Sequence, residues 1–554
     1  MNACIYYHPE AYTTSGPRLM GRNAAGESFL RGYLAHATAS EFWIQTEQQE
    51  HADDFIEKVA QAGRFEPVRV VEKQTLGSSQ QPDLVYFPGP GIGPHAFNRA
   101  AYGHGAWSLT GITHTTSSAR VMDSLVELVT APVQPWDAVI CTSVAVRDNV
   151  QRVIQSQVDH LQERLGITRF VLPRFPVIPL GINTKEFVFT DSQRAAARRA
   201  LGVDGETLVV LFMGRLSFHA KAHPLAMYQA LEAAAQRTGK QVLLVECGWH
   251  ANEFIEKAYM DAAAAVCPTI RVATLDGRKP EDRLTAWAGA DIFCSLSDNI
   301  QETFGITPIE AMAAGLPVVV SDWDGYRDTV RDQVDGFRIP TLMAGPGLGS
   351  DLALRHALEI DTYDAYCGLT CSLVAVDVPA TTDAFARLFE SSGLRRRLGK
   401  SGRARARKLF DWASIIPRYE ALWSELSEIR RARSGELTPR SRLWPARLDP
   451  FDIFAGYPTT QLAPETRLRL VDADAATALQ RTLEYQKLAM VDFAKEIMPS
   501  EEELGAVLEK AAEGPCLAAM LMGPIPTDRR LSVFRSIAWL VKLNILAVVR
   551  EENG

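Results

Sequence analysis

Hydrophobic residues along this chain gather in short runs that are separated by longer amphipathic segments. Continuous apolar runs of this length are typical of parallel strands buried on both faces, and intervening segments such as HPLAMYQALEAAAQ have the spacing of crossover helices. The pattern predicts two doubly wound, Rossmann-like α/β domains in tandem with a cleft between them. The runs of the first series are CIYY, EFWIQT, PVRVV, LVYFPG, WSLTGITHT and DAVICTS, and those of the second are TLVVLFMG, QVLLVECG, IRVATLD, DIFCSLS and LPVVVSD.

Proline and glycine mark the boundaries between these regions. The segment RFPVIPLGINTKEF, residues 174–187, lies where one series stops and the next begins, so we expect a hinge there, with the first domain at 1–180 and the second from 181 onward. Residues 435–554 open with a linker rich in Pro, Gly and Ser and continue into a mainly helical module. This module is either a winged-helix-like domain or a structural appendix, and the pattern favours the appendix.

Composition limits the function classes. The 554 residues are 47% hydrophobic and 22% charged with a net charge of −8, so the chain lacks the global basic field of a nucleic-acid-binding protein. The eight cysteines are scattered, and Cys367 and Cys371 have no second pair at zinc-finger spacing. The start of the chain lacks the pattern of a signal peptide, and no apolar stretch is long enough to span a membrane. We therefore expect a cytoplasmic protein with reduced thiols.

The stretch ETFGITPIEAMAAGLPVVVSD, residues 302–322, carries the first candidate chemistry. Thr307 and Glu310 have the spacing of an N-terminal capping box, with Thr307 as N-cap and a proline directly after it. Free amides at a helix start attract anions, and Gly305 allows a ligand to approach the backbone closely. The local pattern predicts an anion site, and it fits equally well a Glu310 that only caps its helix and a solvated Glu302.

Two cations follow the strand VVLFMG. Gly214 ends this strand, Arg215 comes next, and Lys221 lies six residues further on. Ligands of doubly wound sheets bind outside the carboxyl ends of the strands, so both cations start from the correct edge. The bidentate fork of Arg and the point charge of Lys together suit a diphosphate leaving group.

The segments VIPLGINTKEF, GRLSFHAK and ADIFCSLSDNIQETFGITPIEAMAAGLPVVVSD together resemble the family-4 retaining glycosyltransferases of GT-B fold, which carry paired glutamates with seven intervening residues. The resemblance covers residues 1 to about 430 and is strongest from 175 to 340. Several motifs in the right order make it more specific than any one of them alone.

This resemblance implies roles for the candidate residues. Arg215 and Lys221 would hold the donor diphosphate, Glu302 would contact sugar hydroxyls, and Glu310 would reach the nucleotide ribose. The catalytic set that it implies is His114, Arg215, Lys221 and Glu302. The donor-binding set that it implies is Gly21, Gly214, Arg215, Lys221, Glu302, Phe304, Gly305, Ile306, Thr307 and Glu310.

The first domain contributes a glycine-rich loop and one histidine. Gly16, Gly21 and Gly26 precede a helical pattern, and such a loop can cradle an anion, although the spacing is not that of a dinucleotide fingerprint. The resemblance places this loop near the donor diphosphate and the acceptor. His114 follows a strand, where a single histidine is more often structural. The resemblance makes it the active-site histidine beside the sugar.

The chain departs from the family pattern after the strand LPVVVS. Where the family commonly has two glycines and a glutamate, the sequence SDWDGYRDTV has a single Gly325, and Asp328 stands in place of the acid. Asp322 and Asp324 have a spacing that would also suit a divalent cation. Because the two cations already neutralise a diphosphate, we expect no metal and assign these acids to loop structure or sugar contacts.

Three further segments stand out. PTLMAGPGLGSDLALRHALEIDTYDAYCGLT exceeds the usual connection and is an insertion or a partner-facing surface. The densest basic run, residues 394–412, is more often a solvated helix face than a site for anionic lipid or a charged acceptor. FDWASIIPRYEALWSEL resembles the helix that returns to the first domain in GT-B proteins, which places the end of the second domain at 411 and the returning helix at 412–434.

The predicted function is retaining, metal-independent transfer of a sugar from a nucleotide-sugar donor to an acceptor hydroxyl, with no cofactor and no specific nucleic acid. The base, the sugar and the acceptor stay open, the acceptor being a glycan, a lipid-linked compound, a protein or a small molecule. Peripheral contact with the inner membrane surface and oligomerisation through the C-terminal extension also stay open. The alternatives are a catalytically silent nucleotide-binding GT-B scaffold and a GT-B-fold isomerase or phosphorylase, although no motif identifies the cofactor lysine of a phosphorylase.

Overall fold

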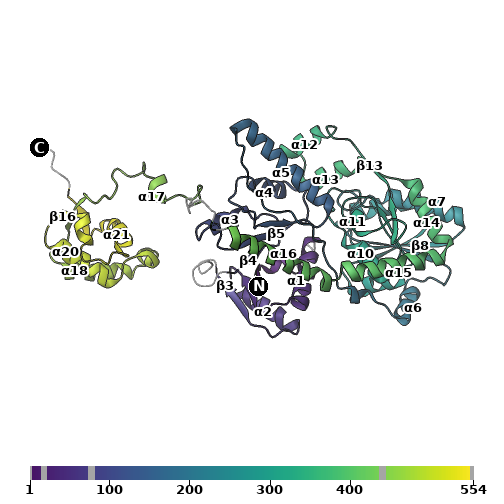
Figure 1. The fold of residues 1–554 in the computed structure, drawn as a ribbon, viewed down its shortest axis with the longest axis horizontal. Coiled ribbons are helices and arrows are strands. Elements are labelled where there is room, and N and C mark those ends of the chain that lie inside the picture. Colours follow the sequence, from purple (N-terminus) through teal and green to yellow (C-terminus); the bar gives the residue numbers. More distant parts are fainter. Residues whose placement is uncertain (1–2, 14–20, 73–81, 434, 436–443, 550–554) are drawn as a thin grey trace. The chain divides into compact units, whose positions relative to one another are not determined.

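The computed structural model describes residues 3–13, 21–72, 82–433, 435 and 444–549. The chain forms two compact units, Met1–Trp444 and Pro445–Gly554 (Figure 1). The first unit contains two six-stranded sheets, one in each of two α/β domains, and the second contains a three-stranded sheet with helices.

The sheet of the first domain is parallel throughout, with strand order β3-β2-β1-β4-β5-β6. This is the order of a doubly wound dinucleotide-binding fold. Its elements are β1 (Ala3–Tyr6), α1 (Gly21–His36), β2 (Phe42–Gln45), α2 (Gln49–Gln61), β3 (Val68–Val71), β4 (Leu84–Tyr86), α3 (Gly93–Ala100), β5 (Ser108–Ile112), α4 (Ala119–Glu127), β6 (Ala138–Ile140) and α5 (Val144–Leu165).

The sheet of the second domain repeats this topology, with order β12-β11-β10-β7-β8-β9 and all pairs parallel. Counted from β7, its strands have the same relative order as those of the first sheet. Its elements are α6 (Asp191–Ala200), β7 (Leu208–Met213), α7 (Leu225–Thr238), β8 (Val242–Gly248), α8 (Glu253–Val266), β9 (Arg271–Asp276), α9 (Pro280–Gly289), β10 (Ile292–Ser295), α10 (Ile306–Ala314), β11 (Val318–Ser321), α11 (Tyr326–Thr329) and β12 (Gly336–Ile339).

The predicted fold class is confirmed. Each of the eleven apolar runs contains a strand, and the central strands β7, β8, β10 and β11 are buried along their whole length. Burial on both faces explains why these strands read as continuous apolar runs and not as alternating ones. The sequence pattern missed β12, whose short run GFRI contains a partly exposed arginine.

An inserted segment follows β12 in the second domain. It consists of β13 (Thr341–Met343), α12 (Ser350–Ala357), α13 (Tyr363–Cys371) and β14 (Val374–Val376), and β13 pairs with β14 in antiparallel fashion. This is the long connection that the sequence marked as an insertion. After it, the chain continues through α14 (Val378–Glu390) and α15 (Ser392–Leu409).

Two chain segments cross between the domains side by side. Ile182 donates its amide to the carbonyl of Phe410 at 2.8 Å, and its carbonyl accepts from the amide of Trp412 at 3.2 Å. The indole ring of Trp412 fills the space that a Cβ would need at Gly32 and Gly181. The crossing therefore consists of two hydrogen-bonded segments, and the ring of Trp412 packs against Gly32 and Gly181 beside them.

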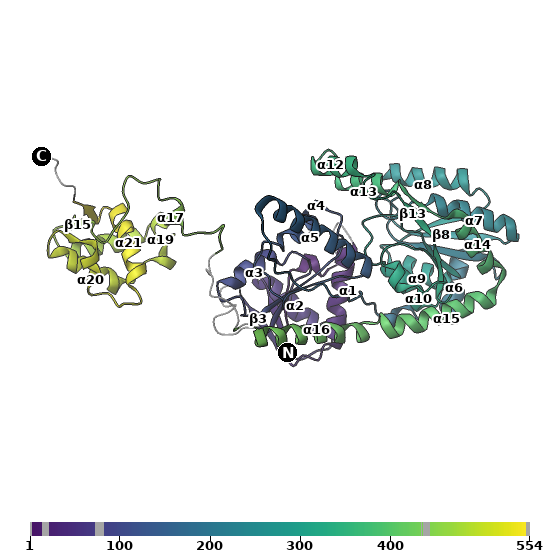
Figure 2. The ribbon, with the colours of Figure 1, turned by 45° about the horizontal axis from the view of Figure 1, so that its top comes forward.

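Helix α16 (Trp412–Arg433) follows this crossing and lies along the first domain, whereas α15 lies along the second (Figure 2). Tyr419 and Trp423 pack their rings against Phe29, Tyr33 and Tyr86 in the core of the first domain. The helix therefore stabilises the first domain, although it follows the second domain in the sequence.

The second unit has its own hydrophobic core. Strands β16, β15 and β17 form an antiparallel sheet in that order, and helices α18, α20 and α21 supply most of the remaining core residues. The elements are α17 (Pro450–Ile453), β15 (Arg467–Leu470), α18 (Ala475–Gln486), α19 (Ala489–Asp492), α20 (Glu501–Ala512), β16 (Cys516–Leu517), α21 (Arg530–Lys542) and β17 (Leu546–Val548). Among the described residues of the whole chain, no helix is long and apolar enough to cross a bilayer.

Candidate functional site

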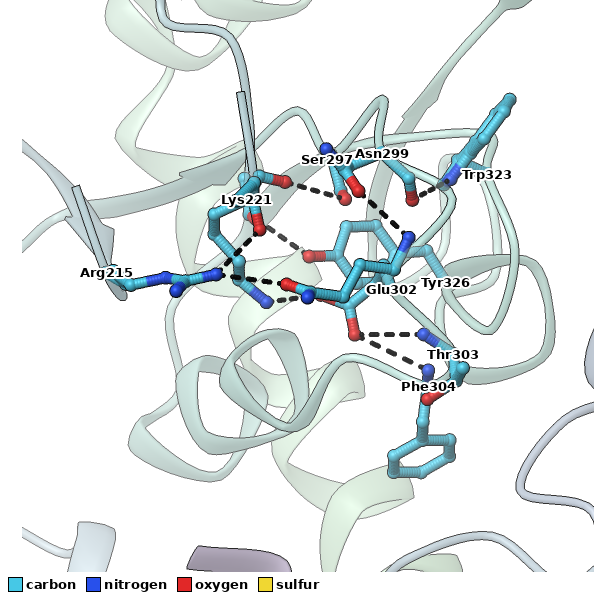
Figure 3. A network of polar contacts seen from close by, with 12 residues as sticks. Arg215, Lys221, Ser297, Asn299, Glu302, Thr303, Phe304, Trp323 and Tyr326 are labelled. Atoms are coloured by element: carbon cyan, nitrogen blue, oxygen red, sulfur yellow. Dashed lines mark hydrogen bonds and ion pairs between the residues drawn. The ribbon is translucent and has the colours of Figure 1, made fainter. Parts of the chain in front are cut away.

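The candidate site forms where the strand order of the second sheet reverses, between β7 and β10. Ligands of doubly wound domains bind outside the carboxyl ends of the strands at this switch point. The loop after β7 carries Arg215 and Lys221, and the loop after β10 carries Asn299 and Glu302. Figure 3 shows these four side chains in one network of polar contacts, so the structure brings the predicted residues Arg215, Lys221 and Glu302 together.

Lys221 and Glu302 form an ion pair in which the side chains are only 26% and 10% exposed. Burial by itself raises the pKa of the Glu302 carboxyl, but the Lys221 ammonium and the amides of Thr303 and Phe304 outweigh it and lower this pKa below the usual value. Those amides lie 3.3 and 3.5 Å from Oε1 of the carboxylate. Glu302 is therefore charged, and a ligand that reaches Lys221 has to share or displace this carboxylate.

Among the described residues, Arg215 makes its hydrogen bonds through one terminal nitrogen, Nη2. Its Nη2 donates to the carbonyl oxygen of Ala220 at 3.1 Å and to Oε1 of Gln301 at 3.0 Å. Within the described part of the chain, Nη1 and Nε have no hydrogen-bond partner. A guanidinium binds phosphate through two parallel N–H groups. Both paired edges of a guanidinium include Nη2, so Nη1 and Nε of Arg215 offer single N–H groups to phosphate oxygens and not a bidentate edge.

Helix α10 begins at Ile306, and the predicted capping box is wrong. Gly305 is the N-cap with φ 80°, no side chain caps the helix, and Thr307 lies inside the first turn. A Cβ at Gly305 would lie 1.9 Å from Cε1 of Tyr326, so both the positive φ and the close contact require glycine. Tertiary packing thus sets the helix start, and the amides of Gly305 and Ile306 find no partner among the residues that the structure describes.

Glu310 lies in the second turn of α10 and does not cap the helix. It forms no hydrogen bond or ion pair with any of the described residues. Burial raises the pKa of its carboxyl to about 7; the positive charge of Arg283 partly opposes this shift, and the negative charge of Glu186 adds to it. The side chain is partly exposed, so its carboxyl can accept hydrogen bonds from a ligand that supplies donors.

Two other residues of the predicted donor set contribute through the backbone. The side chain of Phe304 is 2% exposed and packs edge-on against Phe410, with ring centroids 6.3 Å apart, so it belongs to the core. Gly214 has φ 151°, a conformation that L side chains rarely adopt, and it turns the chain from β7 toward Arg215.

The first domain meets this site through the loops that follow its strands. His114 lies two residues after β5, with Nε2 3.2 Å from the carbonyl oxygen of Pro88. The hydroxyl of Ser143 donates to the carbonyl oxygen of Thr303, next to Glu302, at 2.9 Å. Gly21 is the first residue of α1, and the loop before it, including Gly16, lies outside the described residues.

The acids after β11 also contact the first domain. Oδ1 of Asp324 accepts from the hydroxyl of Ser143 at 3.2 Å, and Oδ2 of Asp328 accepts from the amide of Val144 at 2.6 Å, at the start of α5. Burial, with a smaller contribution from the Glu302 charge, raises the pKa of Asp324 well above its usual value. Asp322 faces an arginine of β12 instead, with 3.5 Å between Oδ1 and Nε. The acids therefore have separate partners.

A close contact explains the single glycine in this loop. A Cβ at Gly325 would lie 2.4 Å from Cα of Phe304, so a larger residue would push away the loop that carries Glu302. Asp324, which stands before it, has φ 43°. Asp is one of the residues that tolerate this conformation, so the position can depart from glycine without losing the turn.

The basic run on α15 serves the second domain itself. Arg403 donates to the carbonyl oxygen of Ala314 at the end of α10 at 2.5 Å, and Arg405 donates to that of Thr329 at 2.9 Å. Arg395 binds a carbonyl oxygen at the end of α14 at 2.5 Å. These arginines stabilise helix ends and turns, which agrees with the structural interpretation of this run.

Sequence reasoning missed Asn299, Gln301 and Tyr363 of the network. Gln301 precedes Glu302 and binds Arg215, and its place beside a named glutamate is the only signal that points to it. Tyr363 in α13 binds Gln301 with 2.9 Å between the hydroxyl oxygen and Nε2. No local pattern around Tyr363 distinguishes it from other helical tyrosines.

Comparisons with known proteins agree with the chemistry of these loops. The family model described as glycosyl transferases group 1 matches residues 193–342. A D-inositol 3-phosphate glycosyltransferase of Thermobispora bispora is 29% identical over 198 residues, which cover 35% of this chain and 45% of that protein. One of Mycobacteroides abscessus is 31% identical over 199 residues, which cover 35% and 42%. The chain thus spans less than half the length of these two relatives.

Solved structures align over more of the chain. The structure of Anabaena HepE in complex with UDP has a TM-score of 0.48 at 16% identity and covers 77% of this chain and all of that one. Sucrose-phosphate synthase from Thermosynechococcus elongatus has a TM-score of 0.45 at 17% identity, over 78% and 99%. The sequence match alone connects the site to a family: residues 193–342, which hold Arg215, Lys221, Glu302 and Glu310, carry the pattern of the group 1 glycosyl transferases.

Proposed function

We propose that this protein transfers a sugar from a nucleotide-sugar donor to an acceptor hydroxyl, with retention of configuration at the sugar. The observation that carries the proposal is the arrangement at the switch point of the second sheet. There the Nη1 and Nε groups of Arg215 and the ammonium of Lys221 accompany the amides of Gly305 and Ile306, which have no partner among the described residues. Phosphate oxygens of a nucleoside diphosphate match these donors.

The two glutamates are assigned to the other two parts of the donor, the sugar and the ribose. Glu302, adjacent to both Lys221 and the start of α10, is placed for the sugar hydroxyls, and Glu310, one turn into the helix, for the ribose hydroxyls. Glu310 has no hydrogen-bond partner among the described residues and is partly exposed, so its carboxyl is available to the ribose hydroxyls. His114 of the first domain is assigned to the sugar from the other side.

The mechanism follows from where charge develops. When the bond to the sugar breaks, negative charge grows on the leaving diphosphate, and fixed cations and amides stabilise that charge without reorganisation. The leaving phosphate accepts the proton of the acceptor hydroxyl on the same face, which gives retention without a protein nucleophile. Contacts between the domains, such as Ser143 with Thr303, exclude water and limit hydrolysis of the donor.

The proposal is tested by thermal-shift and calorimetric screens against UDP-, GDP- and ADP-sugars, since a ligand that binds only the folded protein raises its stability. The donor that binds is then offered to an acceptor panel. This panel includes D-inositol 3-phosphate, the substrate in the names of two relatives. Binding with no transfer to any acceptor supports a silent scaffold, and phosphate-dependent release of the sugar supports a phosphorylase.

Two variants and one additive sharpen the test. Arg215→Ala and Lys221→Ala should each lose about 2 kcal/mol or more of transition-state stabilisation, the usual cost of deleting a contact to developing charge. Arg237→Ala is the matched control, because this exposed arginine pairs with Asp383 on the surface of the same domain. We expect activity to survive EDTA, and a complete, metal-reversible loss would contradict the metal-independent mechanism.

A further inference from the structure

The inserted segment places one helix against the loops of the candidate site. Helix α13 approaches the loop after β7 so closely that a Cβ at Gly368 would lie 2.9 Å from Cβ of His219. Cys371 Sγ also lies 3.8 Å from the carbonyl oxygen of Phe218 in that loop. The first residue of α13, Tyr363, therefore has a fixed position beside Arg215 and Gln301.

The hydroxyl of Tyr363 joins the two domains. It lies 3.1 Å from Oγ1 of Thr115 and 3.0 Å from Oγ of Ser117, which follow His114 in the first domain. It also lies 2.9 Å from Nε2 of Gln301 in the second domain. One hydroxyl offers one donor and two acceptor positions, so these three partners use all of its capacity.

The direction of these hydrogen bonds follows from Arg215. A guanidinium only donates, so the side-chain atom of Gln301 that lies 3.0 Å from Nη2 of Arg215 must be the oxygen. The Gln301 nitrogen therefore faces Tyr363 and donates to it. The Tyr363 hydroxyl is left to exchange hydrogen bonds with Thr115 and Ser117. Donation therefore runs from Arg215 through Gln301 to Tyr363, and the Tyr363 hydroxyl continues the chain to the loop that follows His114.

We propose that Tyr363 is a positioning residue that makes the orientation of Arg215 depend on contact between the two domains, an inference that rests on the proposed transfer reaction. While Thr115 and Ser117 hold the hydroxyl, Gln301 is fixed and holds Nη2 of Arg215, so that the Nη1 and Nε groups face the leaving diphosphate. When the domains separate, the hydroxyl loses two of its three partners and Gln301 loses its fixed support. Donor activation is thereby confined to the state in which the first domain covers the site.

The decisive variant is Tyr363→Phe, which keeps the ring and removes the hydroxyl. The matched control is Tyr366→Phe on the same helix, because the hydroxyl of Tyr366 has no hydrogen-bond partner among the described residues while its ring stacks on His356 at 4.1 Å. We expect Tyr363→Phe to lower kcat about tenfold, the effect of losing a buried hydrogen bond that acts in the transition state. The Kd for UDP, GDP or ADP, whichever binds the wild type, should change less than about threefold because Lys221 and the α10 amides remain.

A second measurement needs no turnover. Ser117→Cys would place a thiol where the Ser117 hydroxyl now lies 3.9 Å from Cys367 Sγ, so that mild oxidation joins the domains when they touch. In this background, Tyr363→Phe should slow crosslinking severalfold and Tyr366→Phe should not. Equal crosslinking rates in both, or wild-type kcat in Tyr363→Phe, would overturn the proposal. If the wild type transfers from no donor, the proposed function fails on its own, and the crosslinking rates still decide whether Tyr363 holds the domains together.

Discussion

At the scale of single residues, two carboxylates eight positions apart have opposite electrostatic environments. Glu302 is paired with Lys221, and its pKa is lowered because the ammonium and two amides outweigh burial. Glu310 has no ion-pair partner among the described residues, and burial, which outweighs the charge of Arg283, raises its pKa to about 7. The first group is therefore a fixed charge of the site, whereas the second changes its charge near neutral pH. Different roles follow, and two predictions separate them.

Substitution by glutamine should affect binding and turnover differently at the two positions. Glu302→Gln removes the charge that neutralises Lys221, so free nucleoside diphosphate should bind at least as tightly as in the wild type while turnover falls about tenfold or more. Glu310→Gln should weaken nucleoside diphosphate binding about five- to tenfold, because a ribose hydrogen-bonds more strongly to a carboxylate than to an amide. Calorimetry and initial rates measure both. Unchanged nucleotide affinity in Glu310→Gln would show that Glu310 does not contact the ligand.

The raised pKa of Glu310 also predicts a pH dependence. Its folded-state value of about 7 exceeds the unfolded value of about 4.3, so the folded protein binds more protons between these limits and the stability contribution of Glu310 falls as the pH rises from about 4.3 to 7. Ligand affinity should run the other way and rise from pH 6 to pH 8 as the carboxylate forms. A nucleotide-sugar is the appropriate ligand, since the terminal phosphate of a free nucleotide titrates near 6. A slope that survives in Glu310→Gln would assign it to another group.

At the scale of elements, the start of α10 shows how far local patterns predict structure. Thr307 and Glu310 satisfy the capping-box spacing, yet the helix starts one residue before Thr307 because Gly305 and Gly325 let two backbone segments approach more closely than any side chain allows. Arg215, Lys221 and Glu302 were predictable because strand ends in a doubly wound sheet converge. Tyr363 was not, since only the folded insertion brings it to Gln301 and to the first domain.

Two glycine substitutions measure what the close contact between Gly305 and the Tyr326 ring contributes to stability. Gly305→Ala adds a Cβ that would lie 1.9 Å from the Tyr326 ring at φ 80°, whereas Gly239→Ala, at the end of α7, adds one at φ 66° with nothing within 4 Å. Gly239→Ala should therefore cost about 1 kcal/mol for the positive φ alone, and Gly305→Ala about 3 kcal/mol or more because the ring must also move. Thermal unfolding midpoints compare the two. Equal midpoints would mean that the ring shifts without cost.

At the scale of the whole molecule, each α/β domain depends on distant sequence. The first domain is completed by α16, whose Tyr419 and Trp423 lie in its aromatic core, and the path to that helix runs back past Ile182 at the crossing between the domains. Two hydrogen-bonded segments and the Trp412 ring connect the domains, so a movement of one against the other has to be absorbed there. A truncation that removes α16 should therefore destabilise the first domain, whereas one that keeps α16 and the residues directly after it should not.

The first compact unit ends at Trp444, within the linker that the sequence predicts from residue 435. Trp444 belongs to this unit, and its ring stacks on Phe97 with centroids 4.7 Å apart and an interplanar angle of 1°. A chain ending at Trp444 should keep the unfolding midpoint and the nucleotide affinity of the intact protein, because every donor-side residue and its contacts lie before that point. A chain ending at Arg433 loses the Trp444 ring and should melt a few degrees lower, since an aromatic pair contributes about 0.5–1.5 kcal/mol beyond its buried area.

Residues 445–554 alone should unfold cooperatively, because they carry their own core of buried aliphatic residues and their own three-stranded sheet. Differential scanning calorimetry of the three chains and the intact protein tests this division. Loss of nucleotide binding in the chain ending at Trp444 would show instead that the C-terminal unit takes part in the donor site.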